Sequence, residues 1–277
     1  MKIGKALRVE RLKLGLTQQQ MCEGIISRPF YAKVESGKNK INAESLFQIL
    51  FKHQIEIDDF CQLIQDTYIT KNRRVINKLQ ERMDYAFSTK DIDSLILNCK
   101  KIMNVPGDRI IKLRTLVAIA YFRNELNEID NGIKKKIKIE FNEGQKWTKR
   151  PESLRLFANT MPLWSQDELI FFIGRLLATV KNENITELML ERYLRIFENY
   201  LATCYERKIP MRKNSNHIEE IIDYITNATS SNVHLMIYRI NAIYMKSLFK
   251  NDKEKVTKIK ADMNDYGYGK LTINWPN

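Results

Sequence analysis

Cationic side chains that can bind a polyanion are concentrated near the N-terminus of the chain. Residues 1–40 carry nine Lys or Arg against three Glu, a net charge of +6, and the whole 277-residue chain has a net charge of +13. An arginine can donate two parallel hydrogen bonds to guanine or to a phosphate, whereas a lysine acts as a point charge on a phosphate. The types of residue in this segment therefore indicate contact with a polyanion.

The first element that positions these side chains is a short helix beginning at Gln18. Thr17 can accept hydrogen bonds from the backbone N–H groups of the next turn, and Gln20 stands three residues later, as a capping box requires. The helix weakens at Gly24. Its N-terminal N–H groups attract phosphate, so Gln18 is a candidate phosphate contact, the alternative being a solvated glutamine.

A second helix is predicted after a tight turn. Ser27 offers an N-cap, Pro29 fits the first turn, where its missing N–H costs little, and Gly37 can end the helix. Tyr31 and Val34 share one face at i, i+3 spacing and are predicted to be buried. The opposite face is predicted to point outward and consists of Arg28, Pro29, Ala32 and Lys33.

Two short helices of this kind are typical of a helix-turn-helix that binds double-stranded DNA, with the outward face of the second helix in the major groove. Arg28 is the candidate base contact, because its guanidinium can hold guanine O6 and N7 together. Phe30 could touch a thymine methyl or could instead fix the local fold. The other candidates are Ser27, Pro29 and Ala32, with Lys33, Lys38 and Lys40 as phosphate contacts.

The spacing of these residues resembles the lambda-repressor-like (Xre-type) helix-turn-helix over residues 1 to about 66. The matching positions are Gly4, Leu7, Arg11, Gly15-Leu16-Thr17-Gln18, Ser27-Arg28, Val34-Glu35 and Ser36-Gly37. More narrowly, EGIISRPFYAKVESGK, followed by about 200 largely helical residues with LFANTM at 156–161, resembles the Rgg/GadR/MutR regulators of low-GC Gram-positive bacteria. Met21-Cys22 and Pro29-Phe30 depart from the pattern, so the base preference cannot be carried over.

The remainder of the chain is predicted to be helical, which makes the whole protein all-α. Residues 1–66 form a five-helix DNA-binding domain, 67–72 a connector, and 73–277 a domain of paired helices. Pairs of about 35 to 40 residues resemble tetratricopeptide units and predict a curved solenoid, although the W-x-x-L-G pattern is missing. The predicted helices are 73–87, 91–103, 109–125, 128–140, 152–161, 166–181, 186–207, 216–228, 232–250 and 253–264.

The concave wall of such a solenoid suits an extended peptide, because inward Asn side chains offer both a donor and an acceptor to a peptide backbone. The resemblance implies that the ligand is a short hydrophobic signalling peptide, as in quorum sensing, and it favours the residues around LFANTM. For each candidate the alternative is a solvated residue or one that bonds another helix. The candidates are Arg155, Asn159, Asn199 and Tyr200.

Other classes of protein find little support in the sequence. The four cysteines are scattered without a C-x-x-C motif or a histidine at ligand spacing, which argues against a zinc site or a disulfide framework. No catalytic arrangement can be argued from spacing, so neither an enzyme nor a cofactor is expected. No segment has the apolar length of a signal peptide or a membrane span, and a cytoplasmic location is expected.

A transcription regulator acting as a homodimer is the leading interpretation, because one small DNA-binding domain covers too few base pairs for selectivity. The sequence alone leaves two alternatives open. One is a stand-alone regulator without a peptide ligand, and the other is a protein-interaction or scaffold module with a DNA-binding head.

Overall fold

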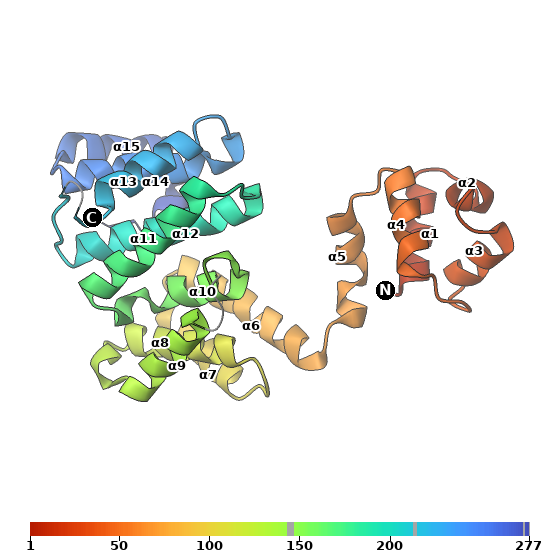
Figure 1. Cartoon of the computed structure of the whole chain (residues 1–277), viewed down its shortest axis with the longest axis horizontal. Coiled ribbons are helices and arrows are strands. Elements are labelled where there is room, and N and C mark those ends of the chain that lie inside the picture. The colour runs from red at the N-terminus through yellow and green to blue at the C-terminus, as the bar shows by residue number, and fades with distance from the viewer. Residues whose placement is uncertain (143–146, 213–214, 274, 277) are drawn as a thin grey trace. The chain divides into compact units, whose positions relative to one another are not determined.

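The computed structural model describes residues 1–142, 147–212, 215–273 and 275–276, which form helices and turns without any strand. The prediction of an all-α fold is confirmed. The chain divides into two compact units, residues 1–77 and 78–277, and Figure 1 labels their helices. Residues 67–72, predicted to be a connector, contain the end of one helix and the beginning of the next.

Five helices and the beginning of a sixth make up the first unit. Their bounds are α1 Ile3–Lys13, α2 Gln18–Cys22, α3 Arg28–Glu35, α4 Ala43–Lys52 and α5 Ile57–Tyr68. Each of the five contributes buried apolar side chains to one core. The capping box is present at the start of α2, where Gln20 N donates to Thr17 Oγ1 at 3.3 Å and Thr17 N donates to Gln20 Oε1 at 2.8 Å.

A close backbone contact between α1 and α3 depends on Gly4. A Cβ added at Gly4 would lie 1.8 Å from the carbonyl oxygen of Val34 and 2.8 Å from its carbonyl carbon. Only glycine allows the two helices to approach this closely. The position of α3, and hence the direction of its outward face, is therefore fixed by α1.

The second unit consists of paired helices. The bounds are α6 Lys71–Ser88, which begins in the first unit, α7 Ile92–Met103, α8 Arg109–Phe122, α9 Asn131–Asn142, α10 Pro151–Thr160, α11 Gln166–Asn182, α12 Glu187–Glu206, α13 Ile218–Ala228, α14 Met236–Phe249 and α15 Lys253–Asp265. Each helix predicted from the sequence between residues 73 and 264 is present, with ends shifted by four residues at most.

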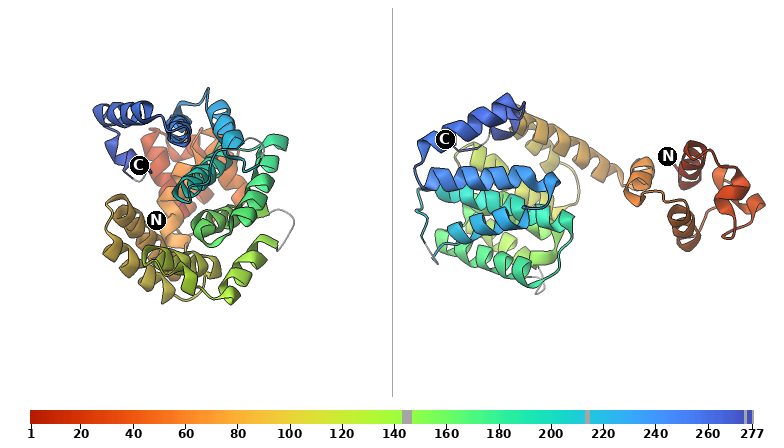
Figure 2. Two further views of the ribbon diagram at one scale, coloured as in Figure 1. Left: turned by 90° about the vertical axis from the view of Figure 1, so that its left-hand side faces the viewer. Right: turned by 90° about the horizontal axis from the view of Figure 1, so that it is seen from above.

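Alternate helices of this unit form one continuous row. α8 packs on α10, α10 on α12 and α12 on α14, whereas within the described ranges α7, α9, α11 and α13 pack mainly on their neighbours in sequence. Helices on the inner side of a curved stack lie closest together. We therefore name α8, α10, α12 and α14 the inner row and their free faces the inner wall. Figure 2 shows the helices of this unit following one another around a curve.

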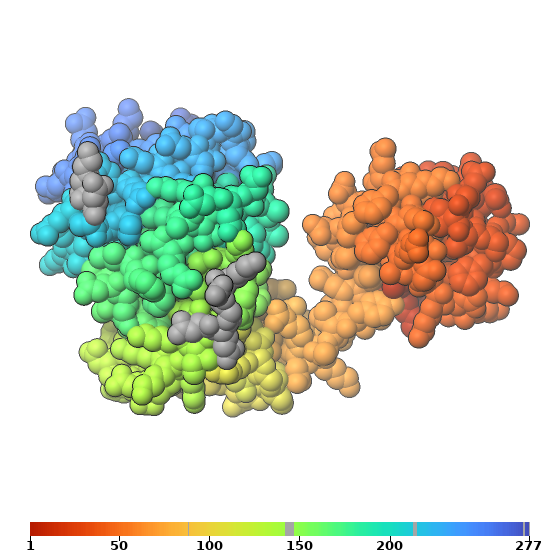
Figure 3. All heavy atoms as spheres, in the orientation of Figure 1, coloured from red at the N-terminus to blue at the C-terminus, as the bar shows by residue number. Residues whose placement is uncertain are grey.

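An aromatic cluster stabilises the middle of the second unit. Phe141, Trp147, Phe157, Trp164 and Phe172 are all buried, and eight ring pairs among them have centroids between 5.2 and 5.9 Å apart. Edge-to-face and tilted contacts of this kind add to the stability that burial alone provides. Figure 3 shows that side chains fill the spaces between the ribbons within each unit. None of the described helices combines the length and the apolar character needed to cross a membrane.

Candidate functional site

α3 presents the predicted DNA-binding side chains. Ser27 occupies the N-cap position with extended backbone, although its side chain makes no capping hydrogen bond, and Pro29 lies in the first turn. Gly37, with φ of +76°, follows the end of the helix and donates its N–H to the carbonyl of Val34 at 3.0 Å. Tyr31 and Val34 are 0% and 2% exposed, as predicted for the inward face. The opposite face of α3 carries mostly exposed side chains.

This outward face combines exposed cations with small side chains. Arg28, Pro29 and Lys33 are exposed, and Ala32 is half-buried. Among the described residues neither Arg28 nor Lys33 forms an ion pair with a carboxylate. Their donors therefore remain available to an external anion. Phe30 is half-buried and packs against the core of the first unit, which favours its role in fixing the fold over contact with a thymine methyl.

Two further cations lie just after α3. Lys38 and Lys40 are exposed, as is Ser27 at the other end of the helix. The backbone N–H of Lys38 donates to the carbonyl of Lys33 at 2.9 Å, which fixes the start of this loop against the helix. The predicted DNA-contact residues of α3 and the following loop thus share one accessible region of the first unit.

Gln18 begins α2, as predicted, and its side chain has a hydrogen-bond partner within the first unit. Its Nε2 donates to Glu35 Oε2 at 2.9 Å, so the side chain is bound inside the first unit. Arg11 binds the same carboxylate through Nε to Oε1 at 2.6 Å and Nη2 to Oε2 at 3.1 Å, and its Nη1 donates to the Leu16 carbonyl at 2.8 Å. A phosphate contact by Gln18 would require it to exchange this internal hydrogen bond.

The Arg11–Glu35 ion pair links α1 to the end of α3 in a partly desolvated setting. Glu35 is only 6% exposed. Burial alone would raise the pKa of Glu35, but the hydrogen bonds from Arg11 and Gln18 outweigh it and lower that pKa. The carboxylate therefore stays ionised at neutral pH, and it holds α1, α2 and α3 in one arrangement behind the outward face.

The predicted peptide-binding residues lie on α10 and α12. Arg155, Asn159 and Asn199 are exposed on inner-row helices. Arg155 Nη1 lies 3.1 Å from Glu152 Oε1, one turn away on the same helix. Asn159 Oδ1 accepts a hydrogen bond from Arg114 Nε of α8 at 2.6 Å, so two helices of the inner row are joined at this point.

Tyr200 requires a correction. It is 0% exposed, and its hydroxyl donates to the carbonyl of Asn216 at 2.7 Å and accepts from Gln166 Nε2 at 3.4 Å. Burial raises the pKa of this phenol. Tyr200 is therefore a core residue that ties α12 to the segment before α13, and a ligand on the inner wall would meet its neighbour Asn199 instead.

Sequence reasoning missed two charged residues of the inner row, Arg114 on α8 and Glu198 on α12. α8 is apolar around most of its circumference, so its pattern does not reveal which face is free. A signal was present in the spacing, since Arg114, Arg155 and Arg195 follow one another at intervals of 41 and 40 residues. That interval equals one helix pair, which places the three arginines at corresponding positions on successive inner helices.

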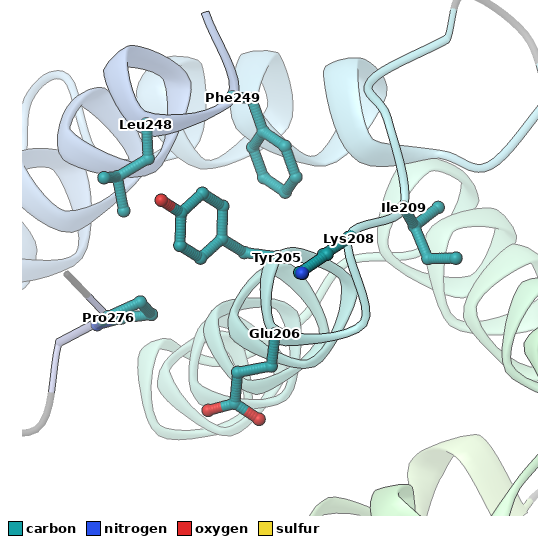
Figure 4. A pocket seen from close by; sticks show the side chains of 7 residues that line it. All are labelled: Tyr205, Glu206, Lys208, Ile209, Leu248, Phe249 and Pro276. Carbon is teal, nitrogen blue, oxygen red and sulfur yellow. The ribbon is translucent and has the colours of Figure 1, made fainter. Parts of the chain in front are cut away.

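An open pocket lies at the C-terminal ends of α12 and α14 (Figure 4). Its volume is about 640 Å³, and it is lined by Tyr205, Glu206, Lys208, Ile209, Leu248, Phe249 and Pro276. Tyr205 and Phe249 meet edge to face at 5.8 Å. Glu206 falls on the same face of α12 as Asn199 and Arg195 by helical spacing, so the pocket continues the inner wall toward the end of these helices.

Most of the first unit matches a known protein family. Residues 7–60 match the family described as Helix-turn-helix. No curated protein sequence is significantly similar to the chain. The match covers α2 and α3 and the residues that pack them against α1, α4 and α5.

Solved structures resemble the chain over nearly its whole length. A protein of Listeria monocytogenes EGD-e, described as a transcriptional regulator, has a TM-score of 0.74 at 18% identity, covering 97% of this chain and 92% of that one. The SHP pheromone receptor Rgg2 of Streptococcus dysgalactiae has a TM-score of 0.70 at 12% identity, covering 98% and 96%.

The PrgX/iCF10 complex has a TM-score of 0.69 at 14% identity, covering 97% of this chain and 85% of that one. At these identities the likeness establishes the fold, in agreement with the resemblance to Rgg-type regulators noted in the sequence. The chain thus joins a helix-turn-helix DNA-binding domain to a helical-repeat domain, and as a whole it has the fold of the regulators Rgg2 and PrgX.

Proposed function

We propose that the chain is a sequence-specific transcriptional regulator that acts as a homodimer and is controlled by a short hydrophobic peptide bound in its repeat domain. The observation that carries the DNA-binding part is the outward face of α3. Arg28 and Lys33 are exposed there, without carboxylate partners among the described residues, on a helix that core packing and the Arg11–Glu35 ion pair hold in place. Such a face can enter a major groove and keep its register.

The cations in and after α3 differ in the part of the DNA that they can contact. Arg28 lies at the N-terminal end of α3, the end that contacts base edges in helix-turn-helix proteins. Lys38 and Lys40 lie beyond the other end of α3 and suit phosphate oxygens. We assign Arg28 to base reading and Lys33, Lys38 and Lys40 to the backbone, with Ser27, Pro29 and Ala32 as small groups that allow close approach.

The homodimer follows from the size of the DNA-binding domain. One α3 of eight residues reads only a few base pairs, whereas two related by a two-fold axis read half-sites one helical turn apart, or a multiple of it. Genomic selectivity requires the larger site. We place the surface that joins the two copies in the repeat domain.

Two observations support a peptide as the controlling ligand. The fold is shared with a protein named as an SHP pheromone receptor and with PrgX in complex with iCF10. In addition, Arg155, Asn159 and Asn199 of this chain are exposed on the inner wall, where they can pair with the backbone and end groups of an extended chain.

Selection from random DNA duplexes tests the DNA-binding part. The full chain is expected to enrich sequences with two symmetry-related half-sites whose centres lie about 10 base pairs apart or a multiple of that. The Arg28→Ala protein is the matched control and should enrich a motif with one position relaxed in each half-site. Recovery of unrelated sequences, or of a single asymmetric half-site at micromolar protein, would contradict the proposal.

A further inference from the structure

Arginine recurs at corresponding positions along the inner row. Arg114 on α8, Arg155 on α10 and Arg195 on α12 stand 41 and 40 residues apart in the sequence. Arg155 and Arg195 each pair with a glutamate on their own helix, at 3.1 and 2.7 Å. Arg114 has no such glutamate, because its Nε donates to the neutral amide oxygen of Asn159 on α10 at 2.6 Å.

Arg114 differs from Arg155 and Arg195 in having no carboxylate partner on its own helix. Within the described part of the chain no carboxylate lies at ion-pair distance from it. Desolvation lowers the pKa of Arg114, and the positive charge of Arg155 lowers it further. The more distant carboxylates of Glu152 and Asp84 raise it in part. A half-buried guanidinium with a neutral hydrogen-bond partner and a second arginine nearby favours an external anion that can accept from its free N–H groups.

Glu198 has the complementary character on α12. It lies on the face that also carries Arg195 and Asn199, and it makes no hydrogen bond or ion pair within the described residues. Burial raises the pKa of Glu198 to about 8, and Arg195 opposes this only in part because it is already paired with Glu191. Tyr238 of α14 faces the same region. A cationic group placed beside Glu198 would supply the partner that the carboxyl group lacks.

The distance between these two groups corresponds to a short peptide. α8 and α12 are two steps apart in the inner row, and each step between packed helices is about 8 to 10 Å. An extended chain rises about 3.3 Å per residue, so two steps correspond to about five to six residues. Asn159 and Asn199 fall between the two ends, where they can bind the peptide backbone.

We infer that the inner wall holds an extended apolar peptide of about six residues by its two ends, with its terminal carboxylate on Arg114 and its terminal ammonium beside Glu198. This inference rests on the proposed peptide ligand and adds its length, its polarity and the residues that select free ends. The C-terminus of the peptide then lies at α8 and its N-terminus at α12. Internal apolar side chains contribute affinity, whereas the two charged ends set the direction.

The probe is a pool of synthetic hexapeptides built from Leu, Ile, Val and Phe, prepared in four forms. The forms have both ends free, the N-terminus acetylated, the C-terminus amidated, or both ends blocked. Binding to the full chain is measured by mass spectrometry of the retained peptides and by calorimetry on the best sequence. Blocking either end is expected to weaken binding at least about tenfold, since a hydrogen-bonded charge is worth that much or more. A tetrapeptide is too short to reach both Arg114 and Glu198. Blocking one of its two ends should therefore leave its binding unchanged.

Charge-removing variants assign each end. Arg114→Gln should make the protein indifferent to C-terminal amidation while it still discriminates against acetylation, and Glu198→Gln should do the reverse. Lys101→Gln on α7 and Glu254→Gln on α15 change the same charges at exposed positions outside the inner row and should retain both preferences.

The outcomes separate the inference from the proposed function. Equal binding of all four forms by the unaltered chain would overturn the assignment of the ends and leave peptide control intact. No binding of any form would contradict peptide control itself. If a variant fails to fold, the binding of the four peptide forms to the unaltered chain still shows whether both peptide ends are recognised.

Discussion

The contact between α1 and α3 offers a direct test of how the DNA-binding domain is held together. Gly4→Ala adds a single methyl group at the point where α1 meets the backbone of α3. That group would lie 1.8 Å from the carbonyl oxygen of Val34, about half of an ordinary van der Waals separation. Because the atom it meets belongs to the backbone, no rotation of a side chain can relieve the overlap.

The expected loss of stability combines two opposing effects. Overpacking of a closely packed contact costs typically about 1 to 3 kcal/mol, and a rigid backbone neighbour favours the upper end of that range. Replacing glycine by alanine inside a helix recovers about 1 kcal/mol, because alanine has the higher helix propensity. We therefore expect the first unit to lose about 2 kcal/mol of its free energy of unfolding.

Hydrogen exchange measured by mass spectrometry is the suitable assay, because all three tryptophans lie at positions 147, 164 and 275 and report only on the second unit. Amides of α1 and α3 should exchange faster by a factor corresponding to about 2 kcal/mol, while those of α8 to α14 stay unchanged. Lys5→Ala, at an exposed neighbouring position, is the control and should leave exchange nearly as it is. Unaltered or slower exchange in Gly4→Ala would refute the reasoning.

Three further outcomes follow from single contacts. The lowered pKa of Glu35 means that its contribution to stability is present above the unfolded-state pKa of about 4.3 and is lost as the pH falls through the lower folded-state value. Protection factors in the first unit, which correct exchange rates for the intrinsic pH dependence of amide exchange, should therefore fall on acidification, and Glu35→Gln should flatten that dependence. Tyr200→Phe removes the hydrogen bond to the Asn216 carbonyl and should lower the free energy of unfolding by about 1 kcal/mol, measured by thermal unfolding, without weakening peptide binding. Weaker peptide binding with unchanged stability would show instead that Tyr200 contacts the ligand. Asn159→Ala should leave the melting temperature nearly intact and weaken peptide binding, whereas a large drop in melting temperature without ligand would make its bond to Arg114 a purely structural link.

The helix-turn-helix could be predicted closely because its signals are local. Thr17 and Gln20 specify a capping box, and Gly37 supplies the positive φ that follows the end of α3, so each element is encoded within a few residues. The inward face of α3 follows from the spacing of Tyr31 and Val34 alone. Hydrogen bonds between side chains that are distant in the sequence could not be predicted in this way. The hydrogen bond from Gln18 to Glu35, for example, joins residues 17 positions apart.

The helices of the repeat domain were predictable, but the exposed face of each helix was not. Both rows of a solenoid carry an apolar face, so the periodicity of a helix cannot tell the inner wall from the outer surface. Tyr200 illustrates this, because it follows Asn199 directly and yet points into the core. Helix ends shifted where turns intervened: His217 adopts a positive φ of 56° before α13, and Asn232 caps a short 3-10 turn before α14.

The helical pattern does not mark where the two compact units meet, for a related reason. α6 begins at Lys71 and continues past residue 77, where the two units divide, so no turn or break in the helical pattern marks the division. A change of composition near residue 70 marks the end of α5 instead.

The most direct test of the central claim compares Arg28→Ala and Lys38→Ala on the selected duplex and on random DNA across a range of salt concentrations. If α3 reads bases as proposed, Arg28→Ala loses about 1 to 3 kcal/mol on the selected duplex and little on random DNA. Lys38→Ala should weaken both duplexes alike and lower the salt slope by about one unit. Equal losses on selected and random DNA for Arg28→Ala would contradict base reading by the outward face of α3.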